Sequence, residues 1–354
     1  MKKVKKKQTQ ALAINIIFSL VALLALTVSI AFLLSNYSLK SKLEQSEDLN
    51  AELSENANIY IYSEDDMNKA VEKAYSEAAD DKKDELLSHI KELMSEGKSA
   101  YYLLRDIFPN DVVVGDKNGY VFFPIDDELI RNDIKLENLI QNEETNEIVY
   151  VNDNKDTISK KGIDVSSHNG RIDWAKVKAD GVEFAFIRVG YRGSTEGALS
   201  LDTTFKYNIE NAISNGIDVG VYFYTQAINE EEAVKEAEYV LDAIEPYDIS
   251  YPVVYDIEEY EGGRADDLSQ DQYTVNTKAF LRTVENAGYE PMVYANLKGL
   301  FIMQDIYELK EYKKWFAYYI YPLYYPYELS IWQYSSTGRV DGIKGDVDLN
   351  IKFD

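Results

Sequence analysis

The sequence after Lys161 predicts an α/β fold in which a mostly parallel sheet closes into a barrel. Eight short runs rich in β-branched or aromatic residues begin at Gly162, Phe184, Asp218, Pro252, Glu290, Lys314, Leu329 and Asp346. Successive starts lie 22, 34, 34, 38, 24, 15 and 17 residues apart. Alternating strands and helices favour a parallel sheet, and eight strands favour closure. Because only the first five intervals have room for a helix, the last strands should lack covering helices.

The chain begins with a basic tail and a long uncharged run. Residues 1–10 hold five lysines and no acid, and residues 11–34 carry no charge. About 20 apolar residues cross a bilayer as a helix, whereas the apolar part of a cleaved signal peptide is about 7 to 15 residues long. We therefore expect a transmembrane signal anchor at 11–34. The lysines place residues 1–10 in the cytoplasm and everything beyond about residue 35 outside.

The next stretch, residues 35–107, is polar and charged, with apolar residues at helical spacing. It predicts a helical spacer. Leu39, Leu49 and Leu53 could belong to about two heptads of a coiled coil, which is too short to predict an oligomer. The oligomeric state therefore stays open. If residues 38–107 were largely helical, they would reach on the order of 100 Å at about 1.5 Å per residue.

Residues 108–160 predict a small α+β module and a linker. Two apolar runs, DVVVG and GYVFFPI, flank the pair Asn118-Gly119, which is typical of a hairpin turn. A third apolar run begins at Glu147, and the polar stretch 152–161 marks the expected boundary with the barrel, residues 161–354.

Composition excludes several classes of function. The chain has 354 residues and a formal net charge of −25, so it would repel a phosphate backbone rather than bind nucleic acid. It has no cysteine, which excludes disulfides, thiolate metal sites and thiol nucleophiles, and it has only two histidines. We expect no cofactor and no resident metal.

Four acids interrupt or follow apolar strands, namely Asp164, Asp256, Glu258 and Asp348. Side chains alternate along a strand, so Asp256 and Glu258 should share one face. Two carboxylates so near to each other raise each other's pKa. A carboxyl group with a raised pKa can act as a general acid near neutral pH. The set is typical of glycosidase chemistry.

The same acids are compatible with roles outside catalysis. Asp164 or Asp348 taken alone is more often a turn former or a helix cap. Asp256 with Glu258 is also compatible with a Mg²⁺ or Ca²⁺ site, because both ions prefer oxygen ligands. Spacing alone does not separate these alternatives.

Several motifs together resemble glycoside hydrolase family 25, the Chalaropsis-type lysozymes. They are GIDVSSHNGRIDWAKVKADGVEFAFIRVGYRG, YPVVYDIE, AGYEPMVYAN, KWFAYY and IWQYSSTGRVDGIKGDVDLN, in order between residues 161 and 354. The resemblance implies an irregular TIM-like barrel of five βα units followed by three strands with short connections. It also implies hydrolysis of the β-1,4 bond between N-acetylmuramic acid and N-acetylglucosamine in peptidoglycan.

Position by position, the resemblance makes Glu258 the general acid and Asp256 its partner carboxylate, with Asp164 and Asp348 lining the same site. Whether the substrate's acetamido group or a carboxylate is the nucleophile stays open. One histidine and several aromatic residues near strand ends are candidates for contacts with sugar rings, although core packing is the commoner role of such aromatics. These candidates are His168, Tyr191, Tyr224, Tyr294, Tyr319 and Trp332.

The sequence therefore predicts a membrane-anchored peptidoglycan hydrolase, with its catalytic domain outside a Gram-positive-type bacterium. The alternative is a non-catalytic cell-wall glycan-binding or scaffold protein, in which the barrel holds glycan without cutting it. A freely secreted endolysin would instead require a mature chain that starts near residue 36.

Overall fold

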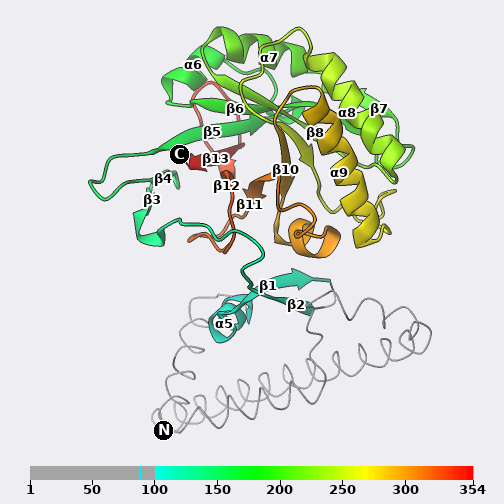
Figure 1. Cartoon of the computed structure of the whole chain (residues 1–354). Helices are drawn as coiled ribbons and strands as arrows, with labels where there is room; N and C mark the ends of the chain where they lie inside the picture. The colour runs from blue at the N-terminus through cyan, green and yellow to red at the C-terminus, as the bar shows by residue number, and fades with distance from the viewer. Residues whose placement is uncertain (1–87, 89–99, 118, 354) are drawn as a thin grey trace, which may run out of the picture. The chain divides into compact units, whose positions relative to one another are not determined.

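The computed structural model describes residue 88, residues 100–117 and residues 119–353 (Figure 1). The predicted anchor at 11–34 and nearly all of the predicted spacer lie outside these residues. Within the described part, none of the helices combines the length and the apolar character that crossing a bilayer requires. The chain divides into two units, residues 1–124 and residues 125–354.

In the first unit, the described residues form one helix and one hairpin. Helix α5 (Ala100–Ile107) precedes strands β1 (Asp111–Asp116) and β2 (Gly119–Pro124), which pair in antiparallel fashion. The register brings Asp116 opposite Gly119, so the expected hairpin is present, but Gly119 begins β2 instead of lying within the turn. Val112, Val113 and Val114 of β1 are buried.

The second unit begins before the predicted boundary at 152–161. Residues 125–158 include η1 (Leu136–Asn138) and the antiparallel pair β3 (Leu139–Gln141) and β4 (Ile148–Tyr150). The expected module at 108–160 is thus divided between Pro124 and Ile125. The reason is that the run at Glu147 pairs with β3 and not with the hairpin, while backbone hydrogen bonds join residues 130–132 to residues 326–328.

The sheet of this unit closes into a barrel of eight strands, β5, β6, β8, β9, β10, β11, β12 and β13, because β5 pairs with both β6 and β13. Their bounds are β5 (Ser159–Val165), β6 (Phe184–Arg192), β8 (Asp218–Tyr224), β9 (Val253–Asp256), β10 (Pro291–Ala295), β11 (Lys313–Ala317), β12 (Ile331–Gly338) and β13 (Val347–Phe353). A short edge strand, β7 (Leu199–Leu201), pairs with β6. The expected barrel is confirmed, with one difference: β13 runs antiparallel to both of its neighbours.

Helical segments follow the first five barrel strands. They are η2 (Ser167–Asn169) with α6 (Trp174–Ala179), α7 (Phe205–Ser214), α8 (Glu230–Ile244), α9 (Gln270–Asn286) and the short π-helix η3 (Gly299–Met303). Figure 1 shows α6 to α9 on the outside of the sheet. Side-chain oxygens cap three of them, since Asp173, Asn229 and Ser269 each accept a hydrogen bond from the backbone three residues on. As predicted, the intervals after β11 and β12 carry no helix.

The barrel interior is filled by large rings placed opposite glycines. A Cβ at Gly220 would lie 2.4 Å from the ring of Phe186, so only glycine leaves room for that ring. Phe186 stacks on Trp315 with 4.4 Å between ring centroids. With Val254, Met292 and Ile331, these side chains form a dry floor inside the barrel. Polar groups above this floor are therefore shielded from water on one side.

Candidate active site

Asp164 lies near the carboxyl end of β5 and is only 6% exposed. Its Oδ2 accepts two hydrogen bonds of 2.8 Å, from Nε2 of Gln333 and from Nδ2 of Asn350. Burial, and then the charge of Asp348, raise the pKa of Asp164 well above its usual range, although the two amides oppose the shift. The site thus contains a carboxyl group that is held in a fixed orientation above the apolar floor.

The two amides are themselves oriented by hydrogen-bond donors on their oxygen atoms. Oδ1 of Asn350 accepts the indole N–H of Trp315 at 2.7 Å, so the NH₂ group must face Asp164. Oε1 of Gln333 accepts the hydroxyls of Tyr294 at 2.8 Å and Tyr319 at 2.6 Å. Because these donors fix the oxygen of each amide, its N–H groups point at Asp164.

Asp256 ends β9, and its side chain points into the barrel, on the same face as Val254. It is 3% exposed, and its Oδ1 has no hydrogen-bond partner among the described residues. In the sheet, Asp256 lies between Tyr224 of β8 and Tyr294 of β10. Burial and the neighbouring Glu258 raise the pKa of Asp256 well above its usual range.

Glu258 follows β9 by two residues and is exposed at the rim, where a substrate can reach it. Burial of part of its surface raises the pKa of Glu258, while a hydrogen bond with Asp256 and the charge of Arg188 lower it. The two acids influence each other's titration, and the pKa of each lies above the usual carboxyl range.

Asp348 reaches the same site from the other direction. Because β13 is antiparallel, its start lies at the carboxyl edge of the parallel strands, with Asp348 directly opposite Asp164. Burial and the charge of Glu258 raise the pKa of Asp348 to about 6. All four predicted acids therefore act on one another at one end of the barrel.

Two features bear on the metal alternative. Arg188 supplies positive charge near the acids, and it is fixed by Asp202 at 2.7 Å and by Ser167 at 3.1 Å. Among the side chains that the structure describes, no group of three or more His, Asp or Glu is arranged to hold a metal ion.

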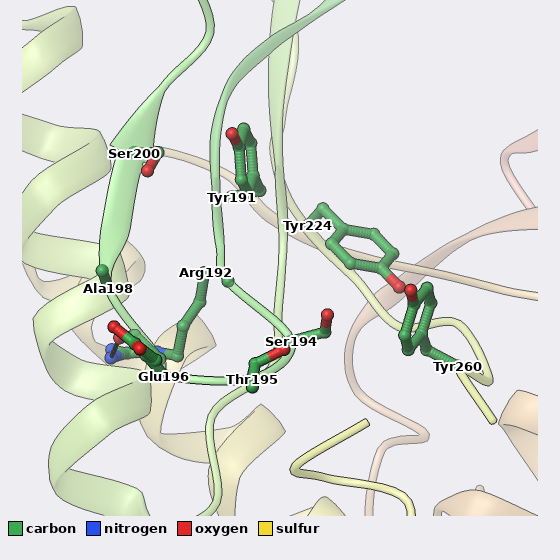
Figure 2. A pocket seen from close by; sticks show the side chains of 11 residues that line it. Tyr191, Arg192, Ser194, Thr195, Glu196, Ala198, Ser200, Tyr224 and Tyr260 are labelled. Carbon is green, nitrogen blue, oxygen red and sulfur yellow. Dashed lines mark hydrogen bonds between the residues drawn. The ribbon is translucent and has the colours of Figure 1, made fainter. Parts of the chain in front are cut away.

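A groove of about 340 Å³ lies beside the ends of β6 and β8 (Figure 2). Its walls are Tyr191 and the loop 193–198, which joins β6 to β7, on one side, and Tyr224 and Tyr260 on the other. Figure 2 shows the hydroxyl end of Tyr224 pointing toward Tyr260. Tyr224 is also the β8 neighbour of Asp256, so one wall of the groove adjoins the acidic site. Flat rings and hydroxyls of this kind suit the faces and edges of sugars.

A partly buried cluster of two arginines and two glutamates holds the groove walls. Arg192 donates to Glu236 at 2.6 Å and to the carbonyl of Gly197 at 2.7 Å. Arg264 binds both carboxylate oxygens of Glu232, at 2.6 and 2.9 Å. Gly197 has φ +72°, and a Cβ there would lie 2.5 Å from Arg264. The loop 193–198 is thus packed tightly against the loop that carries Tyr260.

The sequence comparisons agree with this architecture. The model of Glycosyl hydrolases family 25 matches residues 163–343, which is half of the chain. The chain belongs to this family. It is 32% identical over 205 residues to the uncharacterized protein YegX of Escherichia coli K12, with 54% of this chain and 68% of YegX covered. It is 30% identical over 215 residues to Lysozyme M1 of Streptomyces globisporus, with 55% and 68% covered.

A solved structure is similar as well. The modular autolysin LytC of Streptococcus pneumoniae, in complex with a synthetic peptidoglycan ligand, matches with a TM-score of 0.51 and 25% identity. The match covers 69% of this chain and 57% of that chain. The family 25 barrel described above is therefore that of a glycoside hydrolase.

Five of the predicted sugar-binding residues lie in three different places in this family 25 barrel. Tyr191 and Tyr224 line the groove. Tyr294, which is 8% exposed, and Tyr319, which is 52% exposed, both bind Gln333 beside the acids. His168 is exposed on η2, where its backbone N–H binds Ser166.

The prediction for Trp332 is wrong. Its side chain is fully buried, its indole N–H donates to the carbonyl of Tyr318 at 2.6 Å, and it contacts Tyr334. Because side chains alternate along β12, Trp332 points away from the face on which Gln333 meets the acids. The residue is part of the core outside the barrel.

Sequence reasoning missed Gln333, Asn350, Arg188 and Tyr260. Polar residues inside apolar strands were the available indication for the first three, because IWQYS, DLNIK and FIRVG each carry one. As with the acids, a polar side chain inside an apolar strand is costly to bury and therefore indicates a specific role. Tyr260 lies in a loop, and nothing in its local sequence predicts that it faces Tyr224.

Proposed function

We propose that this chain is a membrane-anchored muramidase that hydrolyses the β-1,4 bond between N-acetylmuramic acid and N-acetylglucosamine in peptidoglycan. The observation that carries the activity is the meeting of Asp164, Asp256, Glu258 and Asp348 at one end of the barrel, above a dry floor and beside an aromatic groove. Family 25 membership and the lysozyme relative support peptidoglycan as the substrate.

Glu258 is the proposed general acid. It is the most exposed of the four acids, and burial of part of its surface raises its pKa, so it keeps a proton to a higher pH than a free carboxyl group does. Transfer of a proton from Glu258 to the glycosidic oxygen allows the bond to the anomeric carbon to break. Water later adds to that carbon and returns a proton to Glu258. Asp256 then carries negative charge next to the positive charge that develops on the sugar, which stabilises the transition state.

Asp164 and Asp348 would complete the site. The two amide N–H groups fix Asp164 in one orientation, so its position does not depend on the substrate. A polar group that is oriented before the substrate binds lowers the barrier without a reorganisation step during reaction. Asp348 is the direct neighbour of Asp164 across the β5–β13 pair and would line the same part of the site.

The anchor belongs to the same proposal. It is supported by the uncharged run at 11–34 and the five lysines before it. Residues 35–107 would then serve as a spacer between the membrane and the folded units, with the barrel outside the cell and peptidoglycan within reach.

Digestion of purified peptidoglycan by the full chain in detergent tests the activity. We expect wild type to release new reducing ends that are N-acetylmuramic acid, and Glu258→Gln to lower the rate at least about 100-fold. Glu259→Gln is the matched control, because Glu259 is the next residue and pairs with Lys298 at the surface. Equal rates for wild type and Glu258→Gln, with saturable glycan binding, would show a non-catalytic glycan-binding protein instead.

A further inference from the structure

Residues 125–141, here called the strap, pack against the catalytic barrel although they precede it in the sequence and lie outside the family match at 163–343. The strap contacts the loop between β11 and β12, residues 318–330. This loop carries Tyr319, whose hydroxyl reaches the amide beside Asp164. The strap is therefore connected to the active site through contacts with this loop.

Contacts along the whole strap hold the loop. Near its start, Asp126 donates its backbone N–H to the hydroxyl of Tyr327 in the loop, and its side chain accepts a hydrogen bond of 2.6 Å from Tyr307, which lies before β11. In its middle, Asn132 binds the carbonyls of Tyr325 and Pro326 through its side chain and its backbone.

The strap also contributes a backbone bridge and a ring contact. Arg131 pairs with Tyr327 as an isolated β-bridge, and its guanidinium lies 5.6 Å from the centre of the Tyr327 ring. At the end of the strap, the carbonyl of Leu139 accepts the hydroxyl of Tyr321 at 2.9 Å. Tyr325 and Tyr327, both of which the strap contacts, are 4% and 2% exposed.

A short chain of hydrogen bonds leads from this loop to the acids. Tyr321 is fixed by the strap, and two residues earlier Tyr319 donates to Oε1 of Gln333 at 2.6 Å. Nε2 of the same amide donates to Asp164 at 2.8 Å. Tyr319 itself is 52% exposed, so burial of its own ring does not fix its place. Its position depends on the loop, and the loop rests on the strap.

From these contacts we propose that the strap is a working part of the active site: it positions Tyr319, and through Gln333 it orients Asp164 for the glycosidase reaction. Tyr321 and Asn132 are thus positioning residues, not catalytic ones. This inference rests on the muramidase activity proposed above. It also assigns to the segment between the predicted anchor and the barrel a role beyond that of a tether.

A double-mutant cycle in the full chain tests the inference. Tyr321→Phe removes only the hydroxyl that binds Leu139, and we expect it to lower kcat/KM about 3-fold to 10-fold, mainly through kcat. In a Tyr319→Phe background, the same change should have almost no further effect, because the path to Gln333 is already cut. Asn132→Ala should behave in the same way.

Tyr207→Phe is the matched control. Its hydroxyl also donates to a backbone carbonyl, that of Ile172 at 2.8 Å, but on α7, away from the β11–β12 loop. It should leave kcat/KM unchanged. If Tyr321→Phe leaves kcat/KM unchanged, or if its effect is as large in the Tyr319→Phe background as in wild type, the inference is overturned.

Hydrogen exchange separates failure of this inference from failure of the proposed function. Amides of residues 318–330 should exchange faster in Tyr321→Phe than in wild type or Tyr207→Phe, whether or not the chain cleaves peptidoglycan. An inactive wild type would contradict the muramidase proposal alone. Unchanged exchange in the loop would contradict the strap proposal alone.

Discussion

Asp348 combines a proposed role in the active site with a cost in stability. Burial and the charge of Glu258 raise its pKa to about 6 in the folded protein, whereas in the unfolded chain the pKa is about 4. Between these pH values the folded state binds more protons than the unfolded state, so the free energy of unfolding falls as pH rises. We expect Asp348→Asn to raise that free energy by about 1 to 3 kcal/mol at pH 7.5 and not to change it below about pH 4.

Thermal unfolding midpoints of both proteins at the two pH values measure this effect. Asp341→Asn serves as the control, because Asp341 is an exposed acid in the same stretch of chain and its removal should change neither midpoint. A stability of Asp348→Asn at pH 7.5 equal to or below that of wild type would contradict the prediction. Loss of activity in a more stable variant would fit the usual conflict between stability and a strained active site.

Two aromatic residues that look alike in sequence should respond in opposite ways. Tyr260 lines the groove and is 52% exposed, so Tyr260→Ala should raise KM about 5-fold to 20-fold and hardly change stability. Trp332 is buried and binds the carbonyl of Tyr318, so Trp332→Phe should lower the free energy of unfolding by about 1 to 3 kcal/mol with KM unchanged. Steady-state kinetics and urea titrations of both variants compare the two effects. A raised KM in Trp332→Phe would restore its assignment to sugar binding.

At the scale of elements, the cluster that joins the β6–β7 loop, α8 and the loop after β9 controls the groove. Arg264 binds both oxygens of Glu232 and the carbonyl of Gln226, a geometry that a lysine does not reproduce. We expect Arg264→Lys to raise KM about 3-fold to 10-fold while kcat stays within about 2-fold, since the acids themselves are not moved. Kinetics on soluble peptidoglycan fragments measure both constants.

A surface pair on the same helix gives the control for this prediction. Lys235 pairs with Glu231 at 2.6 Å on the exposed face of α8, and Lys235→Ala should change neither KM nor kcat, because exposed pairs contribute little. If Arg264→Lys lowers kcat as much as it raises KM, the cluster supports the acids and not only the groove.

Most barrel elements follow from sequence because each is specified by its own residues. The β-branched and aromatic runs at Phe184 and Asp218 form strands, and Asn229 caps α8 as its side chain predicts. The alternation along YPVVYDIE correctly puts Val254 and Asp256 on the interior face. The features that the sequence did not predict correctly depend on residues far away in the chain. The antiparallel course of β13 has no local signature, and the face occupied by Trp332 is set by how β12 closes the barrel.

The candidate site shows the same division. The carboxyl groups were predictable, because a charge inside an apolar strand is costly and therefore needs a reason. The amides of Gln333 and Asn350 obey the same rule, but they do not titrate, and acid–base chemistry alone does not point to them. The role of the strap could not be predicted from sequence, because it depends on a loop about 190 residues later in the chain. In addition, the polar stretch at 152–161 suggested a domain boundary that the structure places after Pro124.

At the scale of the whole molecule, charge is distributed in a way that the net value of −25 conceals. Residues 1–10 carry +5, whereas residues 38–160 and residues 161–354 carry −15 each. A positive end followed by an uncharged run favours insertion with that end in the cytoplasm, and the acidic remainder resists interaction with an anionic membrane surface. The proposed arrangement thus attaches the chain at one end and keeps the barrel away from the lipid.

Fractionation of cells that express the chain tests this arrangement. We expect the full chain in the membrane fraction after washes with high salt and alkaline carbonate, because an inserted helix is retained by apolar burial and not by charge. Protease added to intact cells from which the wall has been removed should cut residues beyond 35 and spare an epitope tag placed before Met1. A chain that lacks residues 2–36 is the control and should be soluble. If the mature protein instead begins near residue 36, as mass measurement of its N-terminus would reveal, the span is a cleaved signal and the hydrolase is released. In that case the lysines direct export, and the distance that the enzyme covers is set by diffusion and not by the spacer.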